Sequence, residues 1–196
     1  MLERICSKWR LRICLALRPD WLEENSTTEK CCWALVSMAE RPGVIQYLDA
    51  VEEALCFGWI DGTRKKISDT QQLAQRLSLR KKKSNWNELN KERVRRLEKL
   101  GWMTEQGLKI LPDMHPESFT IDPDIEARLK QDQDAQAYEN FLNFPELYRR
   151  IRIDNIQGYK EYDRDIFNKR LDKFMKNTKE NKMYGQWDDN GRLSDY

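Results

Sequence analysis

The pattern of apolar and polar positions changes character along the chain. Residues 31–38 are short and apolar enough to predict a strand. Apolar residues then recur at helical spacing over Tyr47–Phe57, and Gly58 is placed to end that helix. Trp59–Gly62 predicts a very short strand with a turn at its glycine, and residues 72–80 alternate with the two-residue period of a half-buried strand. This first part therefore mixes strands with one helix.

Helical spacing dominates from residue 84 onward. Asn85 followed by Glu88 resembles a capping box, and Gly101 follows the helix that this box would begin. The expected apolar stripe of this helix consists of Trp86, Leu89, Arg93, Leu97 and Leu100. A short helix is expected over 104–111, and further helices are expected around 123–129, 138–142, 147–156 and 166–175.

These elements predict an α+β fold. A small antiparallel sheet with a packed helix occupies residues 1–83, a mostly helical part follows over 84–183, and residues 184–196 form a tail or strap. One compact domain overall is the alternative to this division, because 196 residues suit either arrangement.

Composition narrows the class of protein. No stretch approaches the roughly 18 consecutive apolar residues of a membrane span. Five cysteines, an odd number without a C-x-x-C spacing, indicate reduced thiols rather than disulfides or a zinc site. Lys8, Arg10 and Arg12 interrupt the N-terminal apolar run, which is unlike a secretory signal. We therefore expect a cytoplasmic protein with no metal and no cofactor.

Charge is concentrated in the middle of the chain. Residues 62–100 carry 13 Lys and Arg against 4 Asp and Glu. The net charge of residues 1–61 is −3, and that of residues 101–196 is −4. The expected basic patch consists of Lys81, Lys82, Lys83, Arg93 and Arg96. Such a surface, with an aromatic side chain nearby, would attract the phosphates of a nucleic acid. A solvated helix face with Trp86 in the core is the structural alternative, since no recognised nucleic-acid motif is present.

Several unusual residues in the middle of the chain resemble the YdeI/OmpD-associated, bacteriocin-protection family. In that family a helix reading roughly EALCFGWID leads into a basic turn, an arginine strand and a helix start reading SxWSxxN. The corresponding residues here are Tyr47–Gly62, Arg64–Lys66, Gln75–Arg80, Ser84–Asn90 and Glu92–Leu97. Leu77–Leu79 replaces the family's usual Phe-Thr-Pro, and residues 122–180 look like the family's helical end. The resemblance implies a bacterial protein with a role in tolerance of bacteriocins or stress, and it implies no reaction.

The predicted site is a surface for an unknown protein partner or a small anion. Its expected residues are Trp59, Asp61, Arg76, Arg80, Trp86 and Asn90. We expect the Asp61 carboxylate to pair with Arg76 or Arg80, which holds two strands together or presents an anion pocket. The chain is therefore expected to be a non-catalytic binding or accessory protein. The alternatives are a nucleic-acid-associated protein using residues 64–99, and an enzyme or small-anion binder with a pocket at Asp61 and Arg76 or Arg80.

Overall fold

The structure is a computed structural model, and it describes residues 13–14, 31–67, 73–82, 84–131, 136–194 and 196. The expectations for residues 1–12 and 15–30 lie outside these ranges. The chain forms two compact units. The sheet unit comprises Met1–Asn85 and Val94–Pro112, and the helical unit comprises Trp86–Arg93 and Asp113–Tyr196. The predicted boundary after residue 83 lies two residues before the end of the first segment of the sheet unit. Each unit is described by itself.

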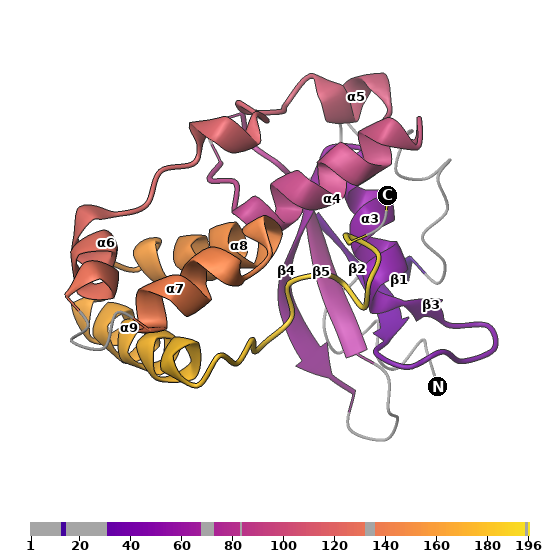
Figure 1. Ribbon diagram of the computed structural model, residues 1–196. Helices are drawn as coiled ribbons and strands as arrows, with labels where there is room; N and C mark the ends of the chain where they lie inside the picture. The colour runs from indigo at the N-terminus through magenta and orange to yellow at the C-terminus, as the bar shows by residue number, and fades with distance from the viewer. Residues whose placement is uncertain (1–12, 15–30, 68–72, 83, 132–135, 195) are drawn as a thin grey trace. The chain divides into compact units, whose positions relative to one another are not determined.

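The sheet unit is built on three longer strands (Figure 1). β2 (Cys31–Ser37) pairs antiparallel with β5 (Leu73–Leu79), and β5 pairs antiparallel with β4 (Trp59–Lys66). Two strands of two residues each, β1 (Ile13–Cys14) and β3 (Ile45–Gln46), pair parallel with β2. The predicted α+β class is confirmed, but the sheet is mixed rather than antiparallel because these two short strands join it in parallel.

One face of the sheet is packed on helix α3 (Tyr47–Cys56). The register aligns Cys32 with Leu77, and Leu77 with Asp61 on the far strand, so these residues point to the same face. α3 contributes Ala50, Val51, Ala54 and Leu55 to the core on this face. Gly58 follows the helix at φ +77°, a left-handed conformation that ends helices and that favours glycine.

β4 is longer than its sequence indicated. The strand continues through Gly62 to Lys66, whereas a turn was expected at that glycine. The pairing with β5 shifts register between Asp61 and Arg64, which is the mark of a β-bulge. The expected turn was wrong because glycine inside a strand also signals a bulge, and a single sequence does not separate the two.

Helix α4 (Glu88–Lys99) begins later than its predicted capping box. The Asn87 side chain, not that of Asn85, accepts the hydrogen bond from the backbone N–H of Asn90, at 2.8 Å. The helix buries Val94 and Leu97, but Leu100 at the end of the expected stripe is 42% exposed.

Helix α5 (Glu105–Leu108) packs against the end of α3. The Thr104 side chain caps α5 by accepting from the Gly107 N–H at 3.2 Å, and its hydroxyl donates to the Cys56 carbonyl at 2.7 Å. A Cβ atom at Gly107 would lie 2.2 Å from that same carbonyl oxygen. Glycine at this position therefore permits the close approach of the two helices.

In its described residues, the helical unit contains the four helices expected from the sequence and a short 3-10 turn, η1 (Pro116–Ser118). The helices are α6 (Pro123–Lys130), α7 (Gln136–Asn143), α8 (Glu146–Gln157) and α9 (Arg164–Lys179). Their shared core contains Ile125, Phe141, Tyr148, Ile153 and Phe174. The helices expected from the apolar spacing in this region are confirmed, including Pro123 in the first turn of α6.

After α9 the chain continues as the C-terminal segment, residues 183–196, drawn in yellow at its end in Figure 1. Trp187 packs edge-on against Tyr148, with ring centroids 5.6 Å apart. Asp189 is 2% exposed and accepts two hydrogen bonds from Arg93, at 2.5 and 2.9 Å. This segment is therefore bound to the unit by an aromatic contact and a buried ion pair. In the described part of the chain, no helix combines the length and apolarity needed to cross a bilayer.

Candidate functional site

A cavity of about 260 Å³ lies within the helical unit. It is lined by Pro116, Glu117, Phe119, Ile121, Phe141, Glu146, Arg149, Arg150 and Ile153. The loop around η1 therefore forms one side of the cavity, and α7 and α8 form the other. Apolar and aromatic side chains with a few convergent polar groups are the usual composition of small-molecule sites.

Short-range hydrogen bonds shape the loop that forms the first side. The Asp113 carboxylate accepts from the backbone N–H of His115 and from the Ser118 hydroxyl. Gln157 of α8 holds the following residues, because its side chain donates to the Thr120 carbonyl at 3.2 Å and accepts from the Asp122 N–H at 3.1 Å. The loop is thereby attached to the helix that carries the cavity's arginines.

Arg150 forms ion pairs with carboxylates of the same unit. It is 8% exposed, and its guanidinium donates to Glu88 at 2.8 Å and to Glu92 at 3.0 Å. Glu146 lies 3.3 Å from its Nε. Burial lowers the pKa of Arg150, but the hydrogen bonds and charges of Glu92 and Glu88 outweigh burial and raise the pKa above its ordinary value. These carboxylates neutralise Arg150, so it offers little charge to a ligand.

Arg149 differs from Arg150 in its contacts with charged groups. Its guanidinium carbon lies 5.5 Å from the centroid of the Phe141 ring. Its Nε is buried and has no hydrogen-bond partner among the residues that the structure describes. Within the same residues, no carboxylate lies within ion-pair distance of Arg149. A half-buried guanidinium that lines an apolar cavity and has no ion pair within the described residues is suited to binding a carboxylate.

Glu117 supplies the opposite charge on the cavity lining. Its side chain is exposed, and it too has no ion pair within the described ranges. The described lining contains no Ser, Cys or His side chain. The arrangement can therefore bind and orient a ligand, and among its titratable groups only Glu117 and Glu146 carry carboxylates.

The residues predicted as a site from the sequence fall in different places. Trp59 is 0% exposed and belongs to the core of the sheet unit. Asp61 accepts a hydrogen bond from the Tyr47 hydroxyl at 2.8 Å. Arg80 is buried and donates to the Asn85 carbonyl at 2.9 Å. Burial lowers the pKa of Arg80 to about 10, and the negative charge of Asp61 opposes this shift. The structure thus brings Asp61 into the electrostatic reach of Arg80.

Arg76 and the two remaining residues are placed elsewhere. Arg76 is exposed and pairs across the sheet with Trp33, while its neighbour Leu77 pairs with Asp61. Because alternate residues of a strand point to opposite faces, Arg76 points away from the face that carries Asp61. Trp86 and Asn90 belong to the helical unit, where Asn90 accepts a hydrogen bond from Arg93 at 2.8 Å.

Two members of the predicted basic patch form internal ion pairs. Arg93 binds Asp189, and Arg96 donates to Glu52 at 2.9 Å while lying 5.9 Å from the centroid of the Trp102 ring. Lys81 and Lys82 are exposed, and Lys83 lies outside the described residues. Among the described residues of the predicted patch, the exposed positive charge therefore resides in Lys81 and Lys82.

Sequence reasoning missed the cavity. The adjacent arginines at 149 and 150 and the proline that begins η1 are visible in the sequence, but neither feature indicates a cavity. A cavity depends on how a loop and two helices pack, and no local spacing records this. The difference between Arg149 and Arg150 depends in turn on Glu88 and Glu92, about 60 residues earlier in the chain.

Comparison with known proteins assigns the two parts of the chain to different family models. Residues 16–110 match a family described as a domain of unknown function (DUF8412). Residues 118–181 match the family described as bacteriocin-protection, YdeI or OmpD-associated. No curated protein and no solved structure matches the chain. The family predicted from the sequence is confirmed by the helical stretch, whereas the residues at 47–97 that suggested it lie within the range of the other model. Residues 118–181 of this chain are therefore a domain of the YdeI/OmpD-associated, bacteriocin-protection family, and they include most of the lining of the cavity.

Proposed function

We propose that this chain is a cytoplasmic, non-catalytic binding protein of bacteria that contributes to tolerance of bacteriocins or stress. Its ligand site is the cavity of the helical unit. The single observation that carries the proposal is Arg149, a half-buried cation that lines an apolar cavity and has no ion pair within the described residues. The description of the matching family supports the link to bacteriocins.

The ligand is a small molecule with an apolar or aromatic body and one carboxylate. The apolar walls from Phe119, Ile121 and Ile153 would cover the body. Arg149 would bind the carboxylate through a charge-assisted hydrogen bond. A volume of about 260 Å³ is just below the range of roughly 300–1,000 Å³ that is usual for ligand pockets, so the ligand is compact.

Binding of phenylacetate measured by calorimetry tests this function. Replacing Arg149 by Met keeps the length and apolar stem of the side chain but removes its charge. We expect Arg149→Met to weaken phenylacetate binding by about 10- to 100-fold, the equivalent of one charge-assisted hydrogen bond. Arg128→Met is the matched control, because Arg128 is 58% exposed and its ion pair with Asp172 is long, at 3.7 Å.

Benzylamine serves as the ligand control, since it has the same ring but the opposite charge. The proposal predicts that benzylamine binds more weakly than phenylacetate and is indifferent to Arg149→Met. Equal phenylacetate affinity in the wild type and in Arg149→Met would overturn the assignment of Arg149.

Association with nucleic acid is a second candidate function, favoured by the exposure of Lys81, Lys82 and Arg76 in the sheet unit. Fluorescence anisotropy of short labelled RNA and DNA tests it at low and physiological salt. Retained binding at physiological salt that is lost when Lys81, Lys82 and Lys83 are changed to Glu would support this candidate. Binding that survives only at low salt would reject it.

A further inference from the structure

A second group of cations lies in the helical unit, on residues that do not line the cavity. We call Arg152 of α8 and Arg170 and Lys173 of α9 the cationic cluster. Arg152 and Lys173 share one aromatic ring, because the Arg152 guanidinium carbon lies 5.5 Å and the Lys173 Nζ lies 4.9 Å from the centroid of Tyr184. Arg170 lies 4.1 Å from the centroid of Tyr159.

These three cations gather without carboxylate partners. Among the described residues, no Asp or Glu lies within ion-pair distance of Arg152, Arg170 or Lys173. Their hydrogen bonds go to neutral oxygens instead. Arg152 donates to the Gln186 carbonyl at 2.5 Å, and Arg170 donates to the carbonyl and side-chain oxygens of Asn155 at 2.7 and 2.5 Å. The positive charge of the cluster is therefore not neutralised within the described fold.

Several other cations of the same unit bind carboxylates. Arg93 binds Asp189, Arg150 binds Glu88 and Glu92, and Lys160 binds Asp122. In the cluster, by contrast, burial and then the charge of Arg170 lower the pKa of Arg152. The two guanidinium groups thus repel each other, and a bound anion would relieve this repulsion.

The backbone is adapted to hold Arg152 in place. Gly185 adopts φ +73°, and a Cβ atom there would lie 2.6 Å from one terminal nitrogen of Arg152. The Nε of Arg152 is buried and has no hydrogen-bond partner among the described residues. The left-handed backbone of Gly185 and the guanidinium packed beside it together favour glycine at this position.

We propose that the cationic cluster binds a phosphoryl group. A phosphate monoester carries a charge of about −1.5 to −2 near neutral pH and three acceptor oxygens, which matches several neighbouring cations better than one carboxylate does. The faces of Tyr184 and Tyr159 already hold cations, so these rings orient the cluster and are not free to stack on a nucleobase. Phosphate chemistry, rather than base recognition, accounts for the arrangement.

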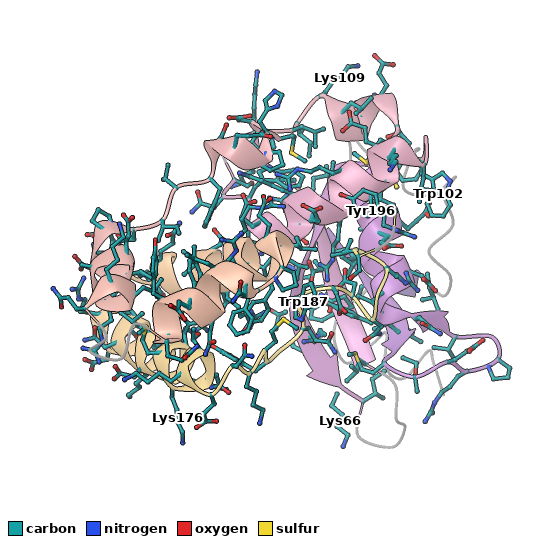
Figure 2. The ribbon with its side chains drawn as sticks, in the orientation of Figure 1. Lys66, Trp102, Lys109, Lys176, Trp187 and Tyr196 are labelled. Atoms are coloured by element: carbon teal, nitrogen blue, oxygen red, sulfur yellow. The ribbon has the colours of Figure 1, made fainter. Side chains whose placement is uncertain are left out.

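Calorimetric titration with inorganic pyrophosphate at about 0.15 M salt tests the proposal, because exposed charges are largely screened there. We expect saturable binding by the wild-type chain. Arg170→Gln and Lys173→Gln should each weaken it by about 10-fold, since each removes one charged donor. Lys176→Gln is the matched control: Lys176 lies three residues after Lys173 on the same helix and points outward (Figure 2). It should change the affinity less than about twofold.

A 12-nucleotide single-stranded RNA distinguishes the sources of the phosphoryl group. Tighter binding of the RNA than of pyrophosphate, with the same dependence on Lys173, assigns the site to the phosphodiester of a nucleic acid. Tighter binding of pyrophosphate assigns it to a free phosphate compound. Absence of pyrophosphate and RNA binding at millimolar concentration, or equal weakening by Lys176→Gln, would overturn the proposal.

Failure of this proposal is distinguishable from failure of the cavity's function. Lys173→Gln should leave phenylacetate binding unchanged, because Lys173 does not line the cavity. Circular dichroism of each variant checks the fold. Lys173 is exposed, so its substitution keeps the test valid even if Arg170→Gln fails to fold.

Discussion

The ion pair between Arg93 and Asp189 should be the most costly single contact to break in the C-terminal segment. Both side chains are almost fully buried, at 6% and 2% exposure, and the carboxylate receives two hydrogen bonds from the guanidinium. Asp189→Asn removes the negative charge but keeps one acceptor oxygen. Asn also tolerates the left-handed backbone of this position, where φ is +49°, so the change tests charge and not backbone strain.

The expected loss of unfolding free energy in Asp189→Asn follows from the burial of the ion pair. Removing one partner of a buried ion pair typically costs about 3–5 kcal/mol, because the other charge remains buried without compensation. The oxygen kept by Asn places the expected value near the lower end, at about 3 kcal/mol. For a chain of this size about 1 kcal/mol shifts the melting temperature by roughly 2–4 °C, so a decrease of roughly 6–12 °C is expected.

Urea denaturation measures the free energy of unfolding, and hydrogen exchange localises the effect to residues 183–196. Asp172→Asn is the matched control, because Asp172 is 72% exposed and lies 3.7 Å from Arg128. Exposed ion pairs contribute about 0–1 kcal/mol, so Asp172→Asn should leave the free energy of unfolding nearly unchanged. Adding Arg93→Met to Asp189→Asn removes the unpaired cation, and a favourable coupling of about 2–3 kcal/mol is expected in the double-mutant cycle. If Asp189→Asn unfolds within about 0.5 kcal/mol of the control, the reasoning about this pair is refuted.

Three further predictions concern contacts inside single units. Gly107→Ala should destabilise the sheet unit, as measured by thermal unfolding, because the new Cβ would meet the Cys56 carbonyl oxygen at 2.2 Å; an unchanged melting temperature would contradict this. Burial raises the pKa of Cys56 to about 12, so iodoacetamide at pH 8 should label half-buried Cys31 before Cys56 in a mass-spectrometric time course; equal labelling rates of these two thiols would contradict the prediction. Burial also raises the pKa of Asp154 above its ordinary value of 3.8, so the stability contributed by its protonated form is present below pH 3.8 and is lost as pH rises through the folded pKa. Asp154→Asn, which keeps an acceptor for the Glu88 N–H, should therefore gain stability relative to the wild type between pH 3.5 and 7 in urea titrations, and a constant difference would contradict this.

Local patterns predicted most of the elements, because helices and strands depend on short-range periodicity and on glycine and proline. The helix over 47–56 and its end at Gly58 illustrate this, since apolar spacing and a left-handed glycine are both local properties. The register shift in β4 was not predictable, because a bulge depends on the partner strand as much as on Gly62 itself.

The candidate site was much less predictable than the fold. Charge counting identified Arg93 and Arg96 as parts of an open basic surface, but their partners Asp189 and Glu52 lie far away in the sequence. Only tertiary structure shows that these charges are neutralised. Arg149 was not predicted as a site residue for the opposite reason. No carboxylate pairs with it among the described residues, and a sequence does not show which cations lack such a partner.

The central claim, that the cavity of the helical unit binds a compact carboxylate, is tested most directly by nuclear magnetic resonance. Phenylacetate is titrated into the isotope-labelled chain, and backbone shifts are followed along the sequence. The account predicts saturable shifts concentrated at residues 116–121 and 141–153, the segments that line the cavity, and their loss in Arg149→Met. Shifts that are absent, that are spread evenly over the chain, or that persist in Arg149→Met would contradict it.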